Sequence, residues 1–261
     1  MTLIEAIILG LVQGLTEFLP VSSSGHLVIF QEILGLNEPG VTLEVLLHFA
    51  TLLSVIFVFR KDFVDLLKFR QDKKAGHYLV MLVIGVLATG VIYLIFNDYV
   101  ERLFQSTLLV GLMLLATGAI LQLTRLVPGG KKDKGLIKPK DAAWVGILQA
   151  VAIIPGISRS GSTILASLWR GLNRETAVKF SFMLAAPIIL AGTLLELKQM
   201  VEVGIEQAML VNYLVGGLAA FLAGIFAIRV FIKLLSGQKL HYFSYYCWAA
   251  GLVVIIFSLL G

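Results

Sequence analysis

The sequence predicts an all-α polytopic membrane protein with six transmembrane helices plus two re-entrant broken-helix hairpins in an inverted-topology repeat. Of its 261 residues, 58% are hydrophobic and only 14% are charged, whereas soluble domains have roughly 45–50% apolar and about 25% charged residues. Several apolar runs reach the ~20 residues needed to cross a ~30 Å hydrocarbon core. Two further apolar runs are interrupted by Pro, Ser and Gly. The bilayer is therefore the expected solvent for most of the chain.

The first expected element is a broken hairpin over residues 3–34, interrupted by Pro20-Val-Ser-Ser-Ser-Gly25. A helix loses backbone hydrogen bonds at such a sequence, and in lipid each unsatisfied polar group costs several kcal/mol. The break must face protein or water, and each half is too short to cross. We expect the segment to enter and leave on one side. It lacks the basic start and cleavage site of a signal peptide, so we expect it to remain in the mature protein.

Three full crossings are expected next, over residues 41–59, 77–96 and 106–127. Basic residues fill the loops after the first and the third of them, which places both loops in the cytoplasm. The connections near 97–105 and 198–207 are acidic and are expected outside, with both termini. The net charge of +5 therefore reflects membrane topology, and we expect no nucleic acid as a partner.

Residues 128–141, rich in Gly, Pro and Lys, form the expected cytoplasmic linker between a first repeat, 1–127, and a second repeat, 142–261. The second repeat opens with a broken hairpin over 142–172, interrupted by Pro155-Gly-Ile-Ser-Arg-Ser-Gly161. It continues with crossings over 175–197, 208–235 and 243–260. Because three crossings follow the first hairpin, the second repeat starts on the opposite face. The repeat is therefore inverted.

The two breaks also resemble each other in sequence. The stretch from Gln13 to Gly25 aligns with the stretch from Gln149 to Gly161, with Gln and Gly at the same spacing. Inverted repeats with broken helices place their binding site near the midplane, where the repeats meet. We therefore expect the two breaks to lie together.

A carboxylate precedes the first break. Gln13 and Glu17 are four residues apart, so they share one face of the first half-helix. An ionisable group inside the bilayer is costly and usually marks a site, a proton path or a paired charge. Glu17 is a candidate metal ligand, general base or partner of Arg159, and Gln13 is a candidate supporting residue.

Hydroxyl side chains follow each break, where the free N–H groups and positive dipole of a helix N-terminus attract anions. Helix capping alone would account for one serine run but not for Arg159, whose guanidinium suits bidentate binding of phosphate. The residues expected to bind phosphate are Ser22, Ser24, Ser158, Arg159, Ser160 and Thr163.

Two histidines are further candidates. His26, one turn beyond the serines, could act as nucleophile, as general acid or as the residue that activates a serine such as Ser23. His48 in the first crossing could line the same cavity, although a packing role accounts for it equally well.

These motifs resemble those of a known family. Gln13-x-x-x-Glu17 leading to Pro20-Val-Ser-Ser-Ser-Gly-His26, with Pro155-Gly-Ile-Ser-Arg-Ser-Gly-Ser-Thr163, is similar to the undecaprenyl-diphosphatase family, the bacitracin-resistance phosphatases. The motifs match in order, and length, linker and hydropathy fit along essentially the whole chain.

The resemblance implies hydrolysis of undecaprenyl diphosphate, a polyprenyl diphosphate lipid, to undecaprenyl phosphate and phosphate. This reaction recycles the lipid carrier of peptidoglycan. The resemblance also implies a multi-pass protein of the bacterial inner membrane, with its active site open to the extracytoplasmic side. A divalent cation, Mg²⁺ or Ca²⁺, is expected with it, and Glu17 is the candidate ligand.

The combined hypothesis assigns Glu17 to metal binding or to activation of the attacking group, and Arg159 to the diphosphate. Ser23, His26 and water remain alternative attacking groups. A secondary transporter or lipid-phosphate flippase is the rival class, because broken helices in inverted repeats are also typical of transporters. A structural membrane subunit would leave the matched polar motifs unexplained. The sequence leaves open whether the chain forms a homodimer.

Overall fold

The computed structural model describes residues 1–36, 41–103, 106–127, 129–203, 209–236 and 239–260, which are helical with no strand among them. The helices of the first half are α1 (Leu3–Phe18), α2 (Ser23–Ile33), α3 (Val41–Val58), α4 (Arg60–Leu67), α5 (Lys73–Leu103) and α6 (Thr107–Leu123). A short 3-10 helix, Thr124–Leu126, follows α6. The helices of the second half are α7 (Pro139–Val151), α8 (Arg159–Trp169), α9 (Arg174–Val203), α10 (Leu210–Ser236) and α11 (Tyr242–Leu260).

Among the described residues, five helices are long and apolar enough to cross a membrane. These candidate spans are Lys73–Phe96, Thr107–Leu126, Arg174–Leu195, Leu210–Leu234 and Tyr242–Leu259. They match five of the six expected crossings, and the sixth corresponds to α3, whose described apolar stretch Val45–Val58 is shorter.

The outward faces of these helices are apolar. Leu94 is 79% exposed and Phe257 is 73% exposed, as suits side chains that contact lipid rather than water. The chain is therefore a polytopic α-helical membrane protein. Residues 104–105 and 204–208, in the connections expected outside, lie beyond the described residues.

One element was missed by the sequence analysis. The basic stretch after the first expected crossing contains the short helix α4, none of whose residues is buried. Phe59, in a turn, separates α4 from α3. Asp65 in α4 forms an ion pair of 3.1 Å with Lys68, the residue just after the helix. α4 has only eight residues, too few for helical periodicity to show in an 11–18-residue window, so the sequence pattern did not distinguish it from a loop.

Both expected helix breaks are present. In the first, α1 ends at Phe18 and α2 begins at Ser23, and the residue before Pro20 is extended (φ −69°, ψ 147°), as a following proline favours. In the second, α7 ends at Val151 and α8 begins at Arg159. The two helices of each broken segment pack against each other, α1 on α2 and α7 on α8.

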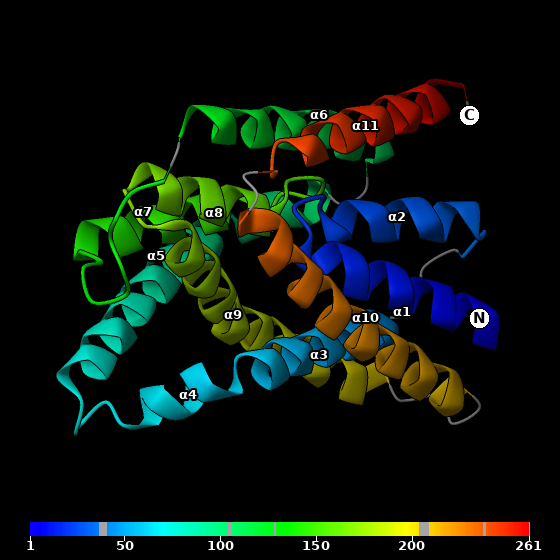
Figure 1. The fold of residues 1–261 in the computed structure, drawn as a ribbon. Coiled ribbons are helices and arrows are strands. Elements are labelled where there is room, and N and C mark those ends of the chain that lie inside the picture. Colours follow the sequence, from blue (N-terminus) through cyan, green and yellow to red (C-terminus); the bar gives the residue numbers. More distant parts are fainter. Residues whose placement is uncertain (37–40, 104–105, 128, 204–208, 237–238, 261) are drawn as a thin grey trace.

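The two halves make matching helix contacts. α1 packs on α10 of the second half, while α7 packs on α5 of the first, and α6 and α11 lie side by side along one edge (Figure 1). A β-carbon at Gly10 would collide with the carbonyl of Gly216, and one at Gly146 with the carbonyl of Gly85. Gly10 and Gly146 are equivalent in the register that aligns the two breaks. Small residues thus let both pairs of backbones approach closely.

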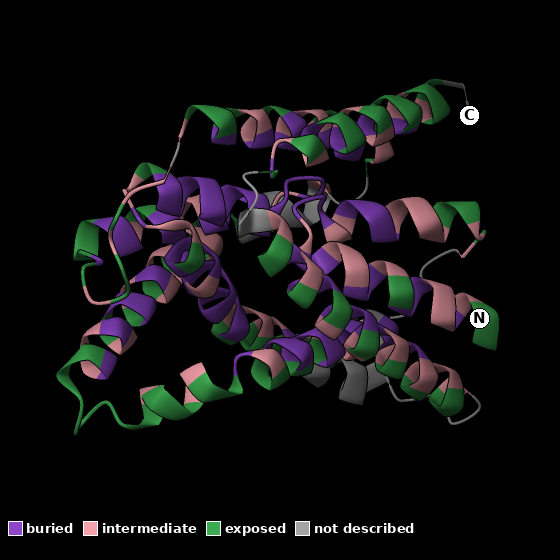
Figure 2. Cartoon of the chain, viewed as in Figure 1, coloured by how far each residue is buried: buried purple, intermediate pink, exposed green. Residues whose placement is uncertain are grey.

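The arrangement places the two breaks in the interior. In Figure 1, α1 and α2 lie to the right, α7 and α8 lie to the left, and the breaks meet between them. Ser160 of the second break donates to the carbonyl of Leu19 in the first at 3.3 Å. Buried residues gather around this junction, while α10 and α11 carry exposed residues on their outer faces (Figure 2).

A buried carboxylate fastens the linker to the second half. Asp141, fully buried, accepts hydrogen bonds from Lys132 Nζ (2.8 Å), Arg170 Nε (2.7 Å) and the Lys138 N–H (3.0 Å). Burial alone would raise the pKa of Asp141, but the bonds from Lys132, Lys138 and Arg170 outweigh it and hold that pKa below its ordinary value. The resulting stabilisation is present at neutral pH and is lost as the pH falls through the lowered pKa.

The glycine contact between α7 and α5 gives a test of the packing. Gly146→Ala should lower the free energy of unfolding by about 1–3 kcal/mol, because the added methyl group overpacks the contact with Gly85. Gly90→Ala, in the same helix pair but with nothing within 4 Å of the added atom, is the matched control and should be neutral or slightly stabilising. Thermal unfolding in detergent measures both, and equal melting temperatures would contradict the close contact.

Candidate active site

A cavity of about 200 Å³ lies where the two breaks meet. Its lining comes from both halves of the chain: Thr16, Glu17, Ser22, Ser23, Ser24, His48, Ala152, Ile153, Ile157, Ser158, Arg159 and Ile189. Most of the residues that the sequence singled out thus lie around one space.

Glu17 is the centre of the polar contacts. One carboxylate oxygen accepts from Arg159 Nη2 at 2.5 Å, and the other accepts from the Ser23 hydroxyl at 2.5 Å and from Gln13 Nε2 at 3.2 Å. Glu17 is only 9% exposed. A carboxylate buried to this extent requires a cation and hydrogen-bond donors around it. The structure therefore joins the last turn of α1 to the first residue of α8 through a buried ion pair.

Serine side chains cap the helices that begin at the two breaks. Ser22 accepts from the N–H of Gly25, and Ser158 accepts from the N–H of Gly161. Each cap hydroxyl also lies 3.3 Å from the hydroxyl two residues later. The first turns of α2 and α8 both border the cavity, so the positive ends of two helix dipoles border it as well. Such helix N-termini bind phosphate and other anions.

Two buried polar atoms next to Glu17 have no hydrogen-bond partner among the described residues. They are Nη1 of Arg159 and Oε1 of Gln13. Leaving a buried donor or acceptor unpaired costs about 1–3 kcal/mol, so these atoms call for an explanation. The unpaired guanidinium N–H suits a phosphate oxygen, and the unpaired amide oxygen suits a cation or a donor.

The residues present fit a divalent cation shared with a phosphorylated ligand. No group of three or more His, Cys, Asp or Glu capable of holding a metal occurs in the part of the chain that the structure describes. Mg²⁺ is commonly held by one or two carboxylates together with phosphate oxygens and water. Glu17 lines the cavity and can supply one such carboxylate, whereas Gln13 bonds to Glu17 through Nε2 and does not line the cavity.

His26 does not line the cavity. Its Nδ1 lies 2.7 Å from the carbonyl oxygen of Ser22, and its Nε2 lies 2.7 Å from the hydroxyl of Tyr246. The two rings are stacked with centroids 5.6 Å apart. Both ring nitrogens of this candidate are thus engaged away from Glu17.

Ser160 and Thr163, also expected to bind phosphate, form hydrogen bonds to other parts of the chain. Ser160 contacts Ser158 and the first break, as described above, and Thr163 bonds to the Arg159 carbonyl (2.8 Å) and to the Ser181 hydroxyl (2.6 Å). Neither lines the cavity, whereas His48 of α3 does.

Two side chains that the sequence analysis did not select hold the breaks in place. Thr117 of α6 donates to the carbonyl of Gly156 at 2.8 Å and accepts from the N–H of Ser158 at 2.9 Å. Cys247 of α11 donates to the carbonyl of Pro20 at 3.7 Å. Pro20 and Gly156 are equivalent in the register that aligns the breaks, so each break is held by the last helix of one half. An isolated polar residue in an apolar helix was the available signal for Thr117.

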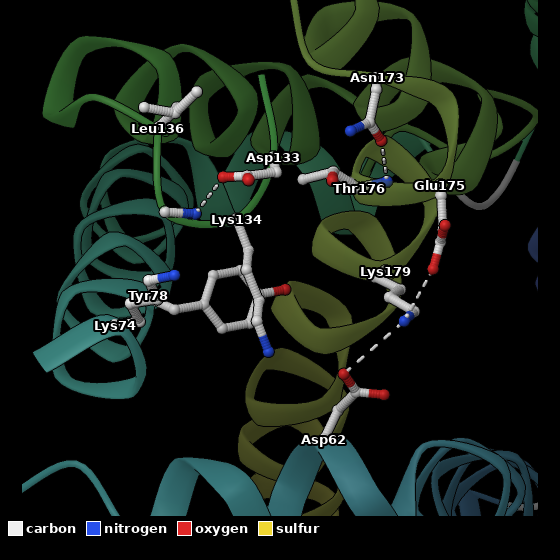
Figure 3. A pocket seen from close by; sticks show the side chains of 11 residues that line it. Asp62, Lys74, Tyr78, Asp133, Lys134, Leu136, Asn173, Glu175, Thr176 and Lys179 are labelled. Atoms are coloured by element: carbon white, nitrogen blue, oxygen red, sulfur yellow. Dashed lines mark hydrogen bonds and ion pairs between the residues drawn. The ribbon is translucent and has the colours of Figure 1, made fainter. Parts of the chain in front are cut away.

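A larger cavity, of about 490 Å³, lies elsewhere, between α4, the start of α5, the linker and the start of α9 (Figure 3). Its charged residues are Asp62, Lys74, Asp133, Lys134, Glu175 and Lys179, which balance in sign. Lys179 reaches Glu175 at 3.0 Å and Asp62 at 3.9 Å. None of the predicted site residues lines it, so it is not the candidate active site.

The fold and the smaller cavity define a class of protein: an integral membrane protein that encloses a carboxylate, a guanidinium and two helix N-termini suited to a phosphorylated ligand. Comparison with known families gives a narrower result. The model of the family described as "Bacitracin resistance protein BacA" matches residues 6–253, and the chain belongs to this family. The resemblance noted from the sequence motifs is confirmed.

Individual relatives match along nearly their whole length. The chain is 46% identical over 275 residues to the undecaprenyl-diphosphatase of Alkaliphilus metalliredigens, covering 100% of both chains. It is 43% identical over 258 residues to that of Halothermothrix orenii, covering 99% of each, and 42% identical over 262 residues to that of Carboxydothermus hydrogenoformans, covering 98% of each.

The Thr117 contacts give a test of how the second break is held. Thr117→Val keeps the shape but leaves the Gly156 carbonyl and the Ser158 N–H unpaired, so the free energy of unfolding should fall by about 2 kcal/mol. Thr124→Val is the matched control, because the Thr124 hydroxyl bonds only to the carbonyl of Leu121 in its own turn. Thermal unfolding measures both variants, and a Thr117 variant as stable as the control would contradict the role of Thr117.

Proposed function

We propose that this chain is an integral-membrane undecaprenyl-diphosphate phosphatase. It hydrolyses undecaprenyl diphosphate to undecaprenyl phosphate and phosphate, which recycles the peptidoglycan lipid carrier and confers bacitracin resistance. The observation that carries the proposal is the cluster of Glu17, Ser23 and Arg159 between two helix N-termini. The names of the full-length relatives support the choice of substrate.

The proposed topology is six crossings and two re-entrant hairpins, in two inverted repeats, 1–127 and 142–261, joined by the cytoplasmic linker 128–141. The five long apolar helices, the two breaks and the matching glycine contacts support it. The basic loops support cytoplasmic placement of the linker. In this topology the protein lies in the bacterial inner membrane, and the cavity opens to the extracytoplasmic side.

Arg159 is the proposed diphosphate-binding group. Its Nη2 holds Glu17, while its buried Nη1 remains available to a phosphate oxygen. The N-termini of α2 and α8, with Ser22, Ser24 and Ser158, add hydrogen-bond donors around the same ligand. Phosphoryl transfer depends mainly on such positioning and charge stabilisation.

Ser23 is the proposed attacking group. Its hydroxyl already donates to Glu17, which accepts the proton as Ser23 Oγ bonds to the terminal phosphorus. The bond from that phosphorus to the bridging oxygen breaks, and undecaprenyl phosphate leaves. Water then attacks the phosphoserine: its hydroxyl bonds to phosphorus and its other proton passes to Ser23 Oγ, which releases phosphate and restores Ser23. Glu17 gives up its proton to solvent, which returns the site to its starting state. His26 is not assigned this step because both its nitrogens are engaged elsewhere.

A divalent cation, Mg²⁺ or Ca²⁺, completes the proposed site. Glu17 would hold it together with phosphate oxygens of the substrate and water. When bound, it neutralises part of the charge of the diphosphate.

Phosphate release from a polyprenyl diphosphate by the purified protein in detergent tests the proposal. The parent should be active with Mg²⁺ or Ca²⁺ and inactive after chelation. Arg159→Ala should reduce turnover by roughly 10²–10³-fold, because it removes a donor to the developing charge. Arg125→Ala, which changes an exposed arginine outside the cavity, is the matched control and should stay active.

Other variants separate the remaining roles. Near-full activity in Glu17→Gln would remove Glu17 from the mechanism, and an active Ser23→Ala protein without a trapped phosphoserine would favour attack by water. Substrate flux in liposomes without any phosphate release would favour the transporter class instead.

A further inference from the structure

We infer that Tyr246 is a positioning residue for the proposed reaction, because it fixes His26 and thereby the turn that directs Ser23 at Glu17. The inference rests on the function proposed above. Tyr246 lies in α11, far along the chain from the first break, and belongs to none of the motifs that define the site.

The contact between Tyr246 and His26 is specific in geometry. The tyrosine hydroxyl lies 2.7 Å from His26 Nε2, and the rings are nearly parallel, 10° apart, with centroids separated by 5.6 Å. His26 is buried, whereas Tyr246 is half exposed at the outer face of α11. A hydrogen bond and a stacking contact together fix both the position and the plane of the imidazole.

The hydrogen bonds also fix which nitrogen carries the proton. The Ser22 carbonyl can only accept, so the Nδ1 that lies 2.7 Å from it must be protonated. In a neutral ring Nε2 then holds the lone pair, and the Tyr246 hydroxyl donates to it. The Ser22 carbonyl thus selects the Nδ1–H tautomer, and Tyr246 holds the ring in place by donating to the remaining nitrogen.

Ser22 is the residue whose conformation needs this support. It has φ 70°, the only positive φ of a non-glycine residue in the described chain. Such a conformation persists only where the surroundings determine it from several sides. The Ser22 carbonyl accepts from the His26 ring and from the His26 N–H (3.2 Å). The next residue, Ser23, donates to Glu17, so the turn sets the position of the proposed nucleophile.

A second contact from the same helix supports the turn from its other end. Cys247, fully buried, bonds to the carbonyl of Pro20 and packs with Val21. α11 thus contacts the first break at consecutive positions, through Cys247 directly and through Tyr246 by way of His26.

The second break has no such arrangement. Ser162 occupies the position equivalent to His26, and Thr117 bonds to the backbone of that break directly. Ser158, which is equivalent to Ser22, has an ordinary extended conformation (φ −75°, ψ 116°). The histidine and tyrosine therefore accompany the one break that has both the unusual backbone and the proposed nucleophile.

Tyr246→Phe keeps the ring and removes the hydroxyl, which makes it the primary test. We expect kcat for phosphate release to fall by roughly three- to tenfold with KM nearly unchanged, the size typical of losing one hydrogen bond. Tyr245→Phe is the matched control, because Tyr245 lies edge-on to Trp248 instead of facing His26, and it should retain parent activity.

Two variants of His26 separate positioning from direct chemistry. His26→Asn keeps a side-chain donor near the position of Nδ1, so it should retain clearly more activity than His26→Ala. In the His26→Asn protein, adding Tyr246→Phe should cause no further loss, since the tyrosine acts through the ring. Equal inactivity of both His26 variants, additive losses, or a Tyr246→Phe protein with parent kcat would overturn the inference.

A readout that does not depend on activity keeps the two proposals distinct. ¹⁵N NMR of histidine-labelled protein in detergent should show His26 as the Nδ1–H tautomer, with an Nε2 resonance that is shifted by the Tyr246 hydrogen bond in the parent and loses that shift in Tyr246→Phe. An Nε2 resonance that is the same in Tyr246→Phe as in the parent would overturn the inference even in an active enzyme. A parent that shows the expected tautomer but releases no phosphate would overturn the proposed function instead.

Discussion

The buried ion pair between Glu17 and Arg159 is the interaction on which the rest of this structure depends. Each charge alone would be costly inside a membrane protein, and a carboxylate or guanidinium left without its partner would destabilise the fold strongly. The two residues come from different halves of the chain, at the end of α1 and the start of α8. The pair therefore exists only if both breaks lie at the same place.

Breaking a helix within a membrane exposes backbone groups that lipid cannot satisfy. This chain satisfies them with protein groups. Ser22 and Ser158 cap the new helix starts, and Thr117 and Cys247 bond to carbonyl groups of the breaks. Free N–H groups and hydroxyls would be energetically costly if they faced lipid. Where they border a cavity, they can donate hydrogen bonds to an anion. The structural requirement and the proposed chemistry thus have one origin.

Much of this could be predicted from the sequence. Pro, Ser and Gly inside apolar runs have few explanations other than a broken helix, and Glu17 in such a run indicates a site by its energetic cost. The alignment of the two breaks led to the expectation that they lie together, and the register it fixed also aligns the glycine contacts of α1 and α7. These sequence signals lie within each segment itself, so the expected bounds of the broken segments and of five crossings agree closely with the helices of the structure.

Other features depended on contacts between distant parts of the chain. Nothing near His26 in sequence indicates that Tyr246 engages its second nitrogen, and nothing near Gly156 points to Thr117. The direction of a side chain on a short helix is also set by its neighbours in space. Thr163, for example, bonds to Ser181 and does not line the cavity, a placement that its sequence neighbours do not indicate. Helix α4 was missed because its eight residues are too few to show a helical period.

The most direct test of the account is a double-mutant cycle between Glu17→Gln and Arg159→Gln, read as the free energy of unfolding in detergent. Residues that contact each other should show a coupling energy of about 1 kcal/mol or more, with the double variant less destabilised than the sum of the single variants. The pair Glu17→Gln and Arg125→Gln is the control and should be additive. Additivity of the Glu17 and Arg159 variants within about 0.5 kcal/mol would contradict the meeting of the two breaks.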